Sequence, residues 1–599
     1  MEQKKARKAG MMDILRSPYA HRFFKKYKWS YLLGMAILIV IDSAQTEVPR
    51  IVGQVIDGIK YTTIDESGFA SAIIRMAVIA VLVLAGRIGW RYCIFGAARK
   101  IERDMRNDLF SHLNTLPVSY FHEHNAGEIM AYMTNDIEAV RMTFAATIMM
   151  GLDMITIGVT TLLKMIFQID FRLSLVTVIP LSMVAFVSMF VGREMHKRFT
   201  KRQEVFAKVS DFVQEKLSGI KVIKAFVQEE KEIAEFEAVN SESRTANIRD
   251  AKVQAFMFPF MHMIAGCSMA IAIAYGGYIA ILGRITVGDF SAFVQYLNML
   301  VWPIASIGRI INVVTRGSAS LKRVESVLHT ESNIKDALPE IATTEPVKGE
   351  IETRELTFRY PGTDRDVLKD ISFHIKPGQT LGIVGRTGAG KTTLVNLMLR
   401  IIDPDDDMLY IGGREIHTIP LQTLRASTGY VMQDNFLFSD TIRNNIAFGN
   451  HAKSFEEIQQ AAKMACVHDN IVDFPDGYET MVGERGVSLS GGQKQRISIA
   501  RALILDPEIL ILDDALSAVD TDTEEKILEN LKTLRHGKTN VIIAHRISTL
   551  QNADKIIVID GSRIIEEGNH EELVAQGGMY ADLYRRQLLE KMKKEEYKL

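Results

Sequence analysis

The sequence contains few cysteines and no excess of charge of either sign. Its 599 residues include three Cys, namely Cys93, Cys267 and Cys466, which lie far apart and form no C-x-x-C pair. This pattern excludes both a disulfide framework and a cysteine-based zinc site. Lys and Arg total 71 and Asp and Glu total 72, for a formal net charge of −1. The basic excess typical of nucleic-acid-binding proteins is therefore missing, and we expect no nucleic acid among the partners.

Proline and glycine, at 14 and 41 residues, are too few for a collagen-like or low-complexity chain. Apolar residues are abundant: 47% of the chain is hydrophobic although 24% is charged, and the mean hydropathy is +0.06. Such a balance indicates a very apolar part joined to a polar part. The length corresponds to roughly four domains of ~150 residues.

Most apolar residues lie before Gly317 and form candidate membrane spans, which need ~20 residues to cross a bilayer. Three runs lack Asp, Glu, Lys and Arg: Leu173–Gly192, Val253–Gly283 and Phe290–Gly308. Three more are interrupted, flanked or followed by charged residues: Trp29–Ile41, Met76–Gly86 and Met142–Phe167. Taken alone, the last three also fit buried helices of a soluble protein, but beside three clear spans they favour membrane helices. We predict six transmembrane helices.

The distribution of basic residues predicts the orientation. Lys and Arg are frequent between Lys4 and Lys28, before the first span, and scarce in the loop after it, which holds Asp57 and Asp65. The positive-inside rule then places the N-terminus in the cytoplasm. The first apolar run is also short enough for a signal peptide, but no small-residue cleavage site follows it cleanly. Two connections, exemplified by Arg193–Asp250, are long, polar and helix-periodic, so we expect the helices to extend well into the cytoplasm.

The composition changes after the sixth span. Residues 331–349 are polar, contain Pro339 and Pro346, and are predicted to form a linker. Short β-rich runs then alternate with helical patterns, which is typical of a parallel sheet covered on both faces. The clearest strands are Thr380–Val384, Ile509–Leu512, Asn540–Ile543 and Lys555–Ile559. We therefore predict an α-helical membrane domain over residues 1–330, then the linker, then an α/β domain over residues 350–599.

The first of these strands leads into the sequence Gly-Arg-Thr-Gly-Ala-Gly-Lys-Thr, which matches the P-loop pattern G-x-x-x-x-G-K-T between a strand and a helix. Backbone N–H groups of such a loop wrap nucleotide phosphates at a helix N-terminus. Lys391 would reach the β- and γ-phosphates, and the Thr392 hydroxyl would bind Mg²⁺. The strand Ile509–Leu512 ends at Asp513, whose carboxylate suits the same metal. The expected phosphate-binding residues are Gly385, Arg386, Thr387, Gly388, Ala389, Gly390, Lys391, Thr392 and Thr393.

Further motifs, in order along the chain, resemble those of the ATP-binding cassette (ABC) proteins. Between the P-loop and Asp513 stands Leu489-Ser490-Gly491-Gly492-Gln493, which is similar to the family's signature. The resemblance implies that Tyr360 stacks on adenine, that Gln433 senses Mg²⁺ and the γ-phosphate, and that His545 contacts the γ-phosphate. It also implies that Ser517–Asp520 crosses a dimer interface and that Gly483–Gly486 is a loop special to exporters. ATP would lie between the P-loop of one cassette and the signature residues Ser490, Gly491, Gly492 and Gln493 of the other.

The membrane half resembles that of ABC exporters as well. Phe121, Gly127-Glu128 and Asn135-Asp136 are similar to the first cytoplasmic loop of these proteins, and Gly219–Lys231 is similar to the second. In the family these loops carry short coupling helices that press on the nucleotide-binding domains. We expect them here at Asn135–Val140 and Val222–Gln228. One membrane unit and one cassette make a half-transporter, so the resemblance implies a dimer.

Two positions depart from the family pattern. Where the family has a catalytic Glu directly after the strand Asp, this sequence has Asp514. Its carboxylate would lie about one methylene from its place beside the attacking water, and a misplacement of ~1 Å can cost on the order of 100-fold in rate. In the family such an Asp marks the degenerate half of heterodimeric exporters, whereas a tolerated swap would leave a homodimer in which Asp514 is catalytic. The second departure, the acidic run Asp403–Asp407, is expected to be a solvated turn.

The residues and the resemblance together predict an ATP-driven exporter of amphiphilic or drug-like compounds in a bacterial-type plasma membrane, acting in the lipid bilayer with a second half-transporter. ATP and Mg²⁺ are the expected cofactors. The resemblance implies the catalytic residues Asp514, His545 and Gln433 and the metal ligands Thr392, Gln433 and Asp513. Two alternatives stay open, a homodimeric exporter and an ATP-gated regulator or channel.

Overall fold

The computed structural model describes residues 16–337, 345, 347–483 and 489–596. Contacts within the chain group it into two units. The first comprises Met1–Thr115 and His124–Thr330, and the second comprises Leu116–Glu123 and Glu331–Leu599.

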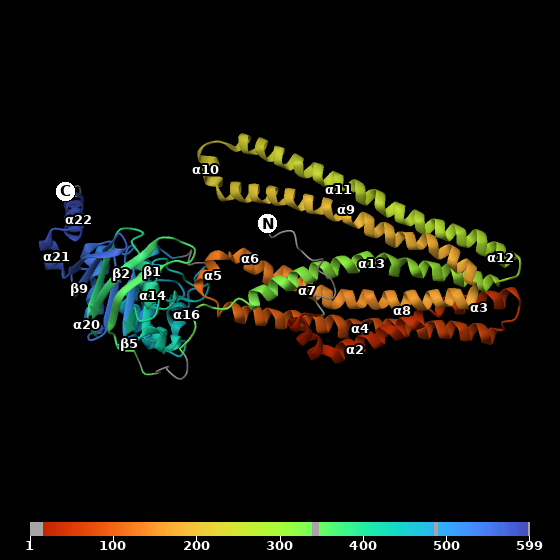
Figure 1. Ribbon diagram of the computed structural model, residues 1–599, viewed down its shortest axis with the longest axis horizontal. Coiled ribbons are helices and arrows are strands. Elements are labelled where there is room, and N and C mark those ends of the chain that lie inside the picture. Colours follow the sequence, from red (N-terminus) through yellow and green to blue (C-terminus); the bar gives the residue numbers. More distant parts are fainter. Residues whose placement is uncertain (1–15, 338–344, 346, 484–488, 597–599) are drawn as a thin grey trace. The chain divides into compact units, whose positions relative to one another are not determined.

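The first unit is built from helices (Figure 1). They are α2 (Pro18–Gln45), α3 (Val48–Lys60), α4 (Glu66–Leu113), α6 (Ala126–Ala131), η1 (Tyr132–Asp136), α7 (Ile137–Met142), η2 (Thr143–Thr147), α8 (Ile148–Lys164), η3 (Met165–Ile169), α9 (Phe171–Ser218), α10 (Ile220–Ala225), α11 (Glu229–Ile271), η4 (Ala272–Gly276), α12 (Gly277–Ile281) and α13 (Val287–Leu328). Polar side chains cap several of them. Asp65 accepts from the Gly68 N–H at 2.8 Å where α4 begins, and Asp170 accepts from the Leu173 N–H at 2.7 Å where α9 begins.

Five helical stretches of the described residues are long and apolar enough to cross a membrane: Pro18–Lys60, Glu66–Leu113, Ala126–Ile169, His262–Ile281 and Val287–Leu328. All three of the charge-interrupted runs fall within them, so each of these runs is part of a helix long enough for the predicted membrane span. The remaining predicted span lies in α9, whose described apolar part, Phe171–Met183, is shorter.

The predicted long polar connection after the fourth span is helical. It consists of the end of α9, the short helix α10 and the beginning of α11, and α9 and α11 lie side by side (Figure 1). Arg202 Nη1 donates to Asp250 Oδ2 at 2.7 Å, and Asp250 is only 2% exposed, so this ion pair joins the two helices in a buried setting. The helix α10 overlaps the segment expected to be the second coupling helix.

The other expected coupling helix, Asn135–Val140, is not a separate element. It belongs to the continuous helical stretch Ala126–Ile169. Asp136 accepts from Arg323 Nε at 2.9 Å and from Ser320 Oγ at 2.8 Å, both on α13, and Ile137 is fully buried. The expected short helix is therefore part of a longer helical stretch, and its role as a coupling helix stays a prediction. A separate short helix, α5 (Val118–Glu123), lies upstream and groups with the second unit.

The second unit contains two sheets (Figure 1). A four-stranded antiparallel sheet has the order β2-β1-β4-β5, and a six-stranded sheet has the order β10-β9-β3-β8-β7-β6, in which only β10 is antiparallel to its neighbour. The strands are β1 (Ile351–Arg359), β2 (Asp366–Ile375), β3 (Thr380–Gly385), β4 (Leu409–Ile411), β5 (Arg414–Glu415), β6 (Thr428–Val431), β7 (Ile509–Asp513), β8 (Thr539–Ile543), β9 (Lys555–Asp560) and β10 (Arg563–Gly568). All four predicted strands are confirmed.

Helices accompany both sheets. They are α14 (Lys391–Met398), η5 (Ile416–Thr418), α15 (Leu421–Ala426), α16 (Ile442–Ile446), η6 (Ala447–Gly449), α17 (Phe455–Met464), α18 (His468–Val472), η7 (Gly477–Glu479), α19 (Gly491–Leu503), α20 (Thr521–Leu534), η9 (Ile547–Thr549), α21 (His570–Gln576) and α22 (Met579–Glu596). Strand β7 divides its side chains between two apolar clusters, with Leu510 and Leu512 in one and Ile509 and Ile511 in the other. This period of two places a packed core on each face of the parallel sheet.

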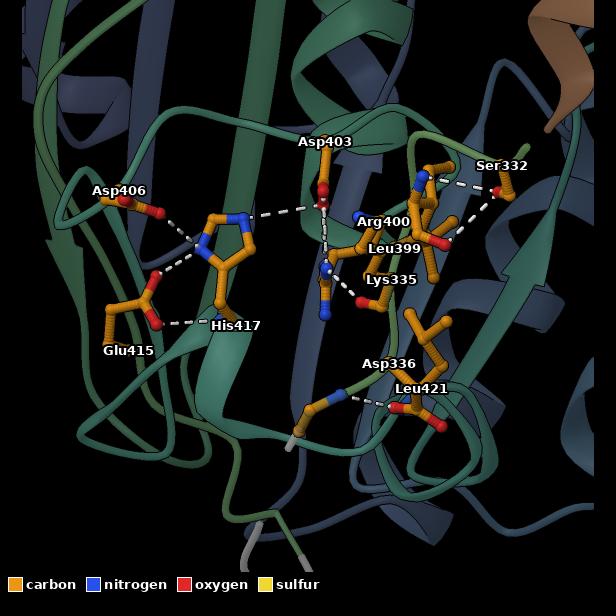
Figure 2. A network of polar contacts seen from close by, with 12 residues as sticks. Ser332, Lys335, Asp336, Leu399, Arg400, Asp403, Asp406, Glu415, His417 and Leu421 are labelled. Atoms are coloured by element: carbon orange, nitrogen blue, oxygen red, sulfur yellow. Dashed lines mark hydrogen bonds and ion pairs between the residues drawn. The ribbon is translucent and has the colours of Figure 1, made fainter. Parts of the chain in front are cut away.

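The first part of the predicted linker is bound to the second unit (Figure 2). Arg400, at 1% exposure, donates from Nη2 to Lys335 O at 2.9 Å, and the Leu421 N–H donates to Asp336 Oδ1 at 2.8 Å. Arg400 Nε also bonds Asp403 Oδ1 at 2.8 Å. The acidic turn is therefore solvated only in part: Asp403 pairs with Arg400, while the side chain of Asp406, 3.5 Å from His417 Nδ1, is 94% exposed.

Candidate nucleotide site

The P-loop connects the buried strand β3 to α14. Gly388 and Gly390 adopt φ of +81° and +98°, which side chains rarely tolerate. A Cβ at Gly390 would lie 2.8 Å from Val367 O, and one at Gly385 would lie 2.3 Å from Ile559 O. These glycines are thus required by the backbone itself, and they leave the loop N–H groups free of side-chain cover.

Lys391, the first residue of α14, is folded back over the loop. Its Nζ donates to Gly385 O at 2.8 Å and to Arg386 O at 3.0 Å, and the residue is 8% exposed. Burial lowers the pKa of Lys391, an effect that the carboxylates of Asp513 and Asp514 oppose. The ammonium group bonds two carbonyl oxygens here, and it can replace these bonds with charge-assisted hydrogen bonds to phosphate oxygens.

Thr392 and Asp513 meet at the end of β7. The Thr392 hydroxyl donates to Asp513 Oδ2 at 2.8 Å, and Asp513 is 2% exposed. Burial raises the pKa of Asp513, and the hydrogen bond from Thr392 opposes that shift. A hydroxyl and a carboxylate side by side are the hard oxygen donors that Mg²⁺ prefers. Among the described residues no group of three or more His, Cys, Asp or Glu could hold a metal ion.

Asp514 and His545 follow neighbouring strands. The Asp514 N–H donates to Ile543 O at 2.9 Å, its φ is +49°, and both Asp514 and His545 line one small cavity of about 100 Å³. Gln587 of α22 brackets the histidine: its Nε2 donates to His545 O at 2.7 Å, and its Oε1 accepts from the Ile547 N–H at 2.8 Å. The histidine backbone is therefore fixed from the C-terminal helix.

Tyr360 and Gln433 follow two other strands, and Tyr360 contacts the segment after the P-loop. Tyr360 follows β1, and its hydroxyl lies 3.2 Å from Thr393 Oγ1, so its ring is next to α14. Gln433 is exposed two residues beyond β6, the parallel neighbour of β7. The P-loop, Gln433, Asp513–Asp514 and His545 thus all follow the carboxyl ends of parallel strands, the edge at which open α/β sheets bind ligands.

The signature residues have a local structural role. Ser490 caps α19 by accepting from the Gln493 N–H at 3.3 Å, and Gln493 Oε1 accepts from the Ser490 N–H at 2.9 Å. A Cβ at Gly492 would lie 2.9 Å from Ala518 O, whereas a Cβ at Gly491 would meet nothing closer than Ala518 Cβ at 3.6 Å. No hydrogen bond in the described part of the chain joins these residues to the P-loop. The signature residues thus form the N-terminus of α19, where the Ser490 cap satisfies the Gln493 N–H.

Sequence reasoning missed four residues that hold the segments around the site. Gln495 and Arg546 bond the loop Ser517–Asp520, Glu524 bonds Arg546, and Gln587 bonds His545 O. Gln495 could have been found, because it lies one helical turn into the helix that begins at the signature. Gln587 carries no motif and is recognisable only from its contacts. Most of the predicted exporter loop Gly483–Gly486 lies outside the described residues.

Comparisons with known proteins identify the family. Residues 31–304 match the ABC transporter transmembrane region, and residues 368–517 match the ABC transporter family itself. A probable multidrug resistance ABC transporter ATP-binding/permease protein of Bacillus subtilis, YheI, is 38% identical, with 95% of this chain and 97% of YheI covered. This chain belongs to the ABC transporters.

Two further relatives match nearly the whole length of this ABC transporter. The multidrug resistance-like ATP-binding protein MdlA of Escherichia coli is 38% identical over 95% of this chain and 96% of its own length. A bacterial Atm1-family ABC exporter solved with ATP bound has a TM-score of 0.78 and 25% identity, covering 94% of this chain and 98% of that one. The predicted exporter-type membrane domain and the ATPase coupled to transport are thereby confirmed.

Proposed function

We propose that this chain is one half of a dimeric exporter that uses ATP to move amphiphilic, drug-like compounds outward across the plasma membrane. The names of YheI and MdlA, which refer to multidrug resistance, support this substrate class. A 35% identical relative, the ATP-dependent lipid A-core flippase of Desulfotalea psychrophila, is named for an amphiphile of another kind. The basic N-terminal segment supports a cytoplasmic N-terminus and cytoplasmic cassettes.

The observation that carries the proposal is that the P-loop, Asp513, Asp514 and His545 all lie at one edge of the parallel sheet. The N-terminus of α19, which carries the signature, makes no described hydrogen bond with the P-loop. In this proposal the N–H groups of residues 385–393 bind the phosphates, and Lys391 leaves its two carbonyl partners for the β- and γ-phosphates. Tyr360 stacks on adenine. Ser490, Gly491, Gly492 and Gln493 bind the nucleotide held by the partner's P-loop.

The hydrolytic roles belong to residues at the ends of β6, β7 and β8. Thr392, Gln433 and Asp513 hold Mg²⁺, which supplies neutralising charge to the phosphate oxygens. Asp514 orients the attacking water and accepts its proton, and His545 contacts the γ-phosphate. Gln587 and the backbone of β8 keep the histidine in place while this happens.

We further propose that the partner is a different half-transporter. Asp514 is one methylene shorter than the Glu usual at this position in the family, while Leu489–Gln493 is an intact signature. This combination supports a slow site formed by the P-loop of this chain and a fast site completed by its signature. A neighbouring reading frame with Glu after its strand Asp and an altered signature would support the heterodimer; the alternative is a homodimer.

Vectorial uptake tests the exporter. Inside-out vesicles from cells that express the chain with its partner should accumulate a fluorescent cationic amphiphile when ATP is added, and vesicles with Lys391→Ala should accumulate little. An ATP-dependent ion conductance without accumulation would instead support the regulator or channel.

A further inference from the structure

The loop Ser517–Asp520 is held by a guanidinium group from another element. Arg546 Nη1 donates to Val519 O at 3.3 Å, and Nη2 donates to Ser517 O at 3.4 Å. Arg546 follows His545 directly in the sequence. One side chain therefore ties this loop to the segment that carries the histidine.

A buried carboxylate orients Arg546. Glu524, in the first turn of α20, is 2% exposed and accepts from Arg546 Nη1 at 2.6 Å with Oε2. Its Oε1 accepts from the buried Thr549 hydroxyl. An unpaired buried carboxylate carries a large desolvation penalty, so Glu524 keeps its cationic partner. Arg546 and Thr549 both lie within four residues of His545, and Glu524 thus fixes that segment at two points.

The opposite side of the loop is held by the helix that begins at the signature. Gln495 of α19, only 6% exposed, donates from Nε2 to Ser517 Oγ at 3.1 Å and accepts from the Ala518 N–H at 2.9 Å. Asp520 ends the loop by capping α20, where it accepts from the Thr523 N–H at 3.0 Å. The loop therefore connects the signature helix on one side to the histidine segment on the other.

We propose that Glu524 is a positioning residue for ATP hydrolysis. By holding Arg546 between the loop Ser517–Asp520 and His545, it makes these two elements move as one body when nucleotide binds. The inference rests on the proposed function in assigning both elements to the nucleotide. Glu524 contacts neither the P-loop nor Asp513 among its described hydrogen bonds and ion pairs, so it acts on the rate of hydrolysis and leaves ATP binding to Lys391 and the P-loop.

The test is Glu524→Gln in the assembled, purified transporter, with Glu525→Gln as the matched control. Gln keeps the size of the side chain and removes the charge that pairs with Arg546. Glu525 is the next residue of α20 and is exposed. We expect Glu524→Gln to lower kcat for ATP about tenfold, because Gln495 bonds the loop that Glu524 holds to the signature helix, which is proposed to complete the fast site. The KM for ATP, photolabelling by an ATP analogue and the thermal unfolding midpoint should be unchanged. Glu525→Gln should behave as the wild type.

Arg546→Lys provides a second arm. Lys keeps a positive charge opposite Glu524 but lacks the planar fork that bonds two loop carbonyls. We expect a similar loss of kcat, and a double variant no slower than the slower single variant, because both residues act through one unit. If Glu524→Gln does not assemble, Arg546→Lys alone decides.

An unchanged kcat in either single variant, or losses that multiply in the double variant, would overturn the proposal. A transporter that hydrolyses ATP but moves no amphiphile would overturn the proposed substrate class and leave this comparison of ATPase rates intact.

Discussion

Adjacent glycines in the signature have different constraints. At Gly492 an added Cβ would meet the backbone carbonyl of Ala518 at 2.9 Å, so a side chain there disturbs the chain's own fold. At Gly491 the space is open, with the nearest atom at 3.6 Å. Because the fold has room for a side chain at Gly491, a loss of activity on substitution there would reflect a lost contact with another molecule and not a disturbed fold.

The first prediction compares Gly491→Asp with Asp514→Asn in the assembled transporter. Gly491→Asp places a side chain and a negative charge at a helix N-terminus proposed to hold the partner's γ-phosphate, so ATPase activity should fall by about 100-fold or more. Asp514→Asn should leave a substantial fraction of activity, because it alters the site that is already slow. Steady-state ATPase rates measure both, and equal, near-complete loss in the two variants would contradict the degenerate site and support a homodimer.

The second prediction concerns Lys391→Ala, which removes the charge that the P-loop offers to the β- and γ-phosphates. Photolabelling of this chain by an ATP analogue should fall at least about tenfold at subsaturating concentration, a change of ~1.4 kcal/mol in binding. Lys526→Ala, at an exposed position of α20, is the control and should label normally. Equal labelling of Lys391→Ala and wild type would show that the P-loop assignment is wrong.

At the scale of elements, α14 links the nucleotide site to the start of the cassette. The helix begins at Lys391, and two residues beyond its last residue Arg400 bonds both Lys335 O and Asp403 (Figure 2). His417 Nε2 lies 3.4 Å from Asp403 Oδ1, and its Nδ1 lies 2.6 Å from Glu415 Oε1. The imidazolium thus supports the carboxylate that orients Arg400, and the linker is fastened through these contacts.

The third prediction follows from the charge of His417. The hydrogen bonds with Asp403 and then Glu415 raise its pKa from 6.5 to about 9. A raised pKa means that this contribution to folding stability is complete below pH 6.5, declines between pH 6.5 and 9, and is lost above pH 9. His417→Gln should therefore destabilise the cassette by about 1–2 kcal/mol at pH 6, since partial exposure screens the pairs, and by much less at pH 10.

The urea midpoint for proteolysis of the cassette, followed from pH 6 to pH 10, measures this difference. Asp405→Asn, in the same turn, is the control, because Asp405 is exposed and no described ion pair joins it to His417, so the change should alter stability by no more than ~0.5 kcal/mol. A gap between His417→Gln and wild type that widens above pH 9 would contradict the prediction.

At the scale of the whole molecule, a single chain leaves much apolar surface uncovered. Its helices expose large apolar side chains such as Phe167, Tyr92 and Ile281, the last at 87%. Lipid would cover such surfaces, and under the proposed function a second half-transporter would cover part of them. The chain also supplies one P-loop and one signature, and the latter makes its described hydrogen bonds within its own helix cap.

The fourth prediction is that this chain, purified alone, has little drug-stimulated ATPase activity and that adding its partner restores it. Asp514 is the reason, because two sites built only from this chain would both carry the shorter carboxylate, at a cost on the order of 100-fold. The measurement is ATP turnover of chromatographically defined species. Full turnover by a demonstrated homodimer would refute the heterodimer.

Much of the nucleotide site is local in sequence and was predictable for that reason. The P-loop glycines, Lys391 and Thr392 lie within one strand–loop–helix unit, and the buried strand before Asp513 fixes where its carboxylate emerges. The apolar runs likewise predicted the membrane helices, because a helix that crosses a bilayer needs a long run of apolar residues, which can be read directly from the sequence.

Other features depend on residues far apart in the chain, and only the tertiary structure decided them. Arg323 lies 187 positions from Asp136, and their ion pair joins to α13 a segment that the sequence suggested as a separate coupling helix. Glu524 and Arg546 pair across 22 positions, and Gln587 reaches His545 from 42 positions away. The sequence by itself determined the P-loop unit, the strand that ends at Asp513 and the apolar helices, because their patterns are set by neighbouring residues. The folded chain decided what holds those motifs in place, because a buried charge or an amide is satisfied by whichever partner the packing brings to it.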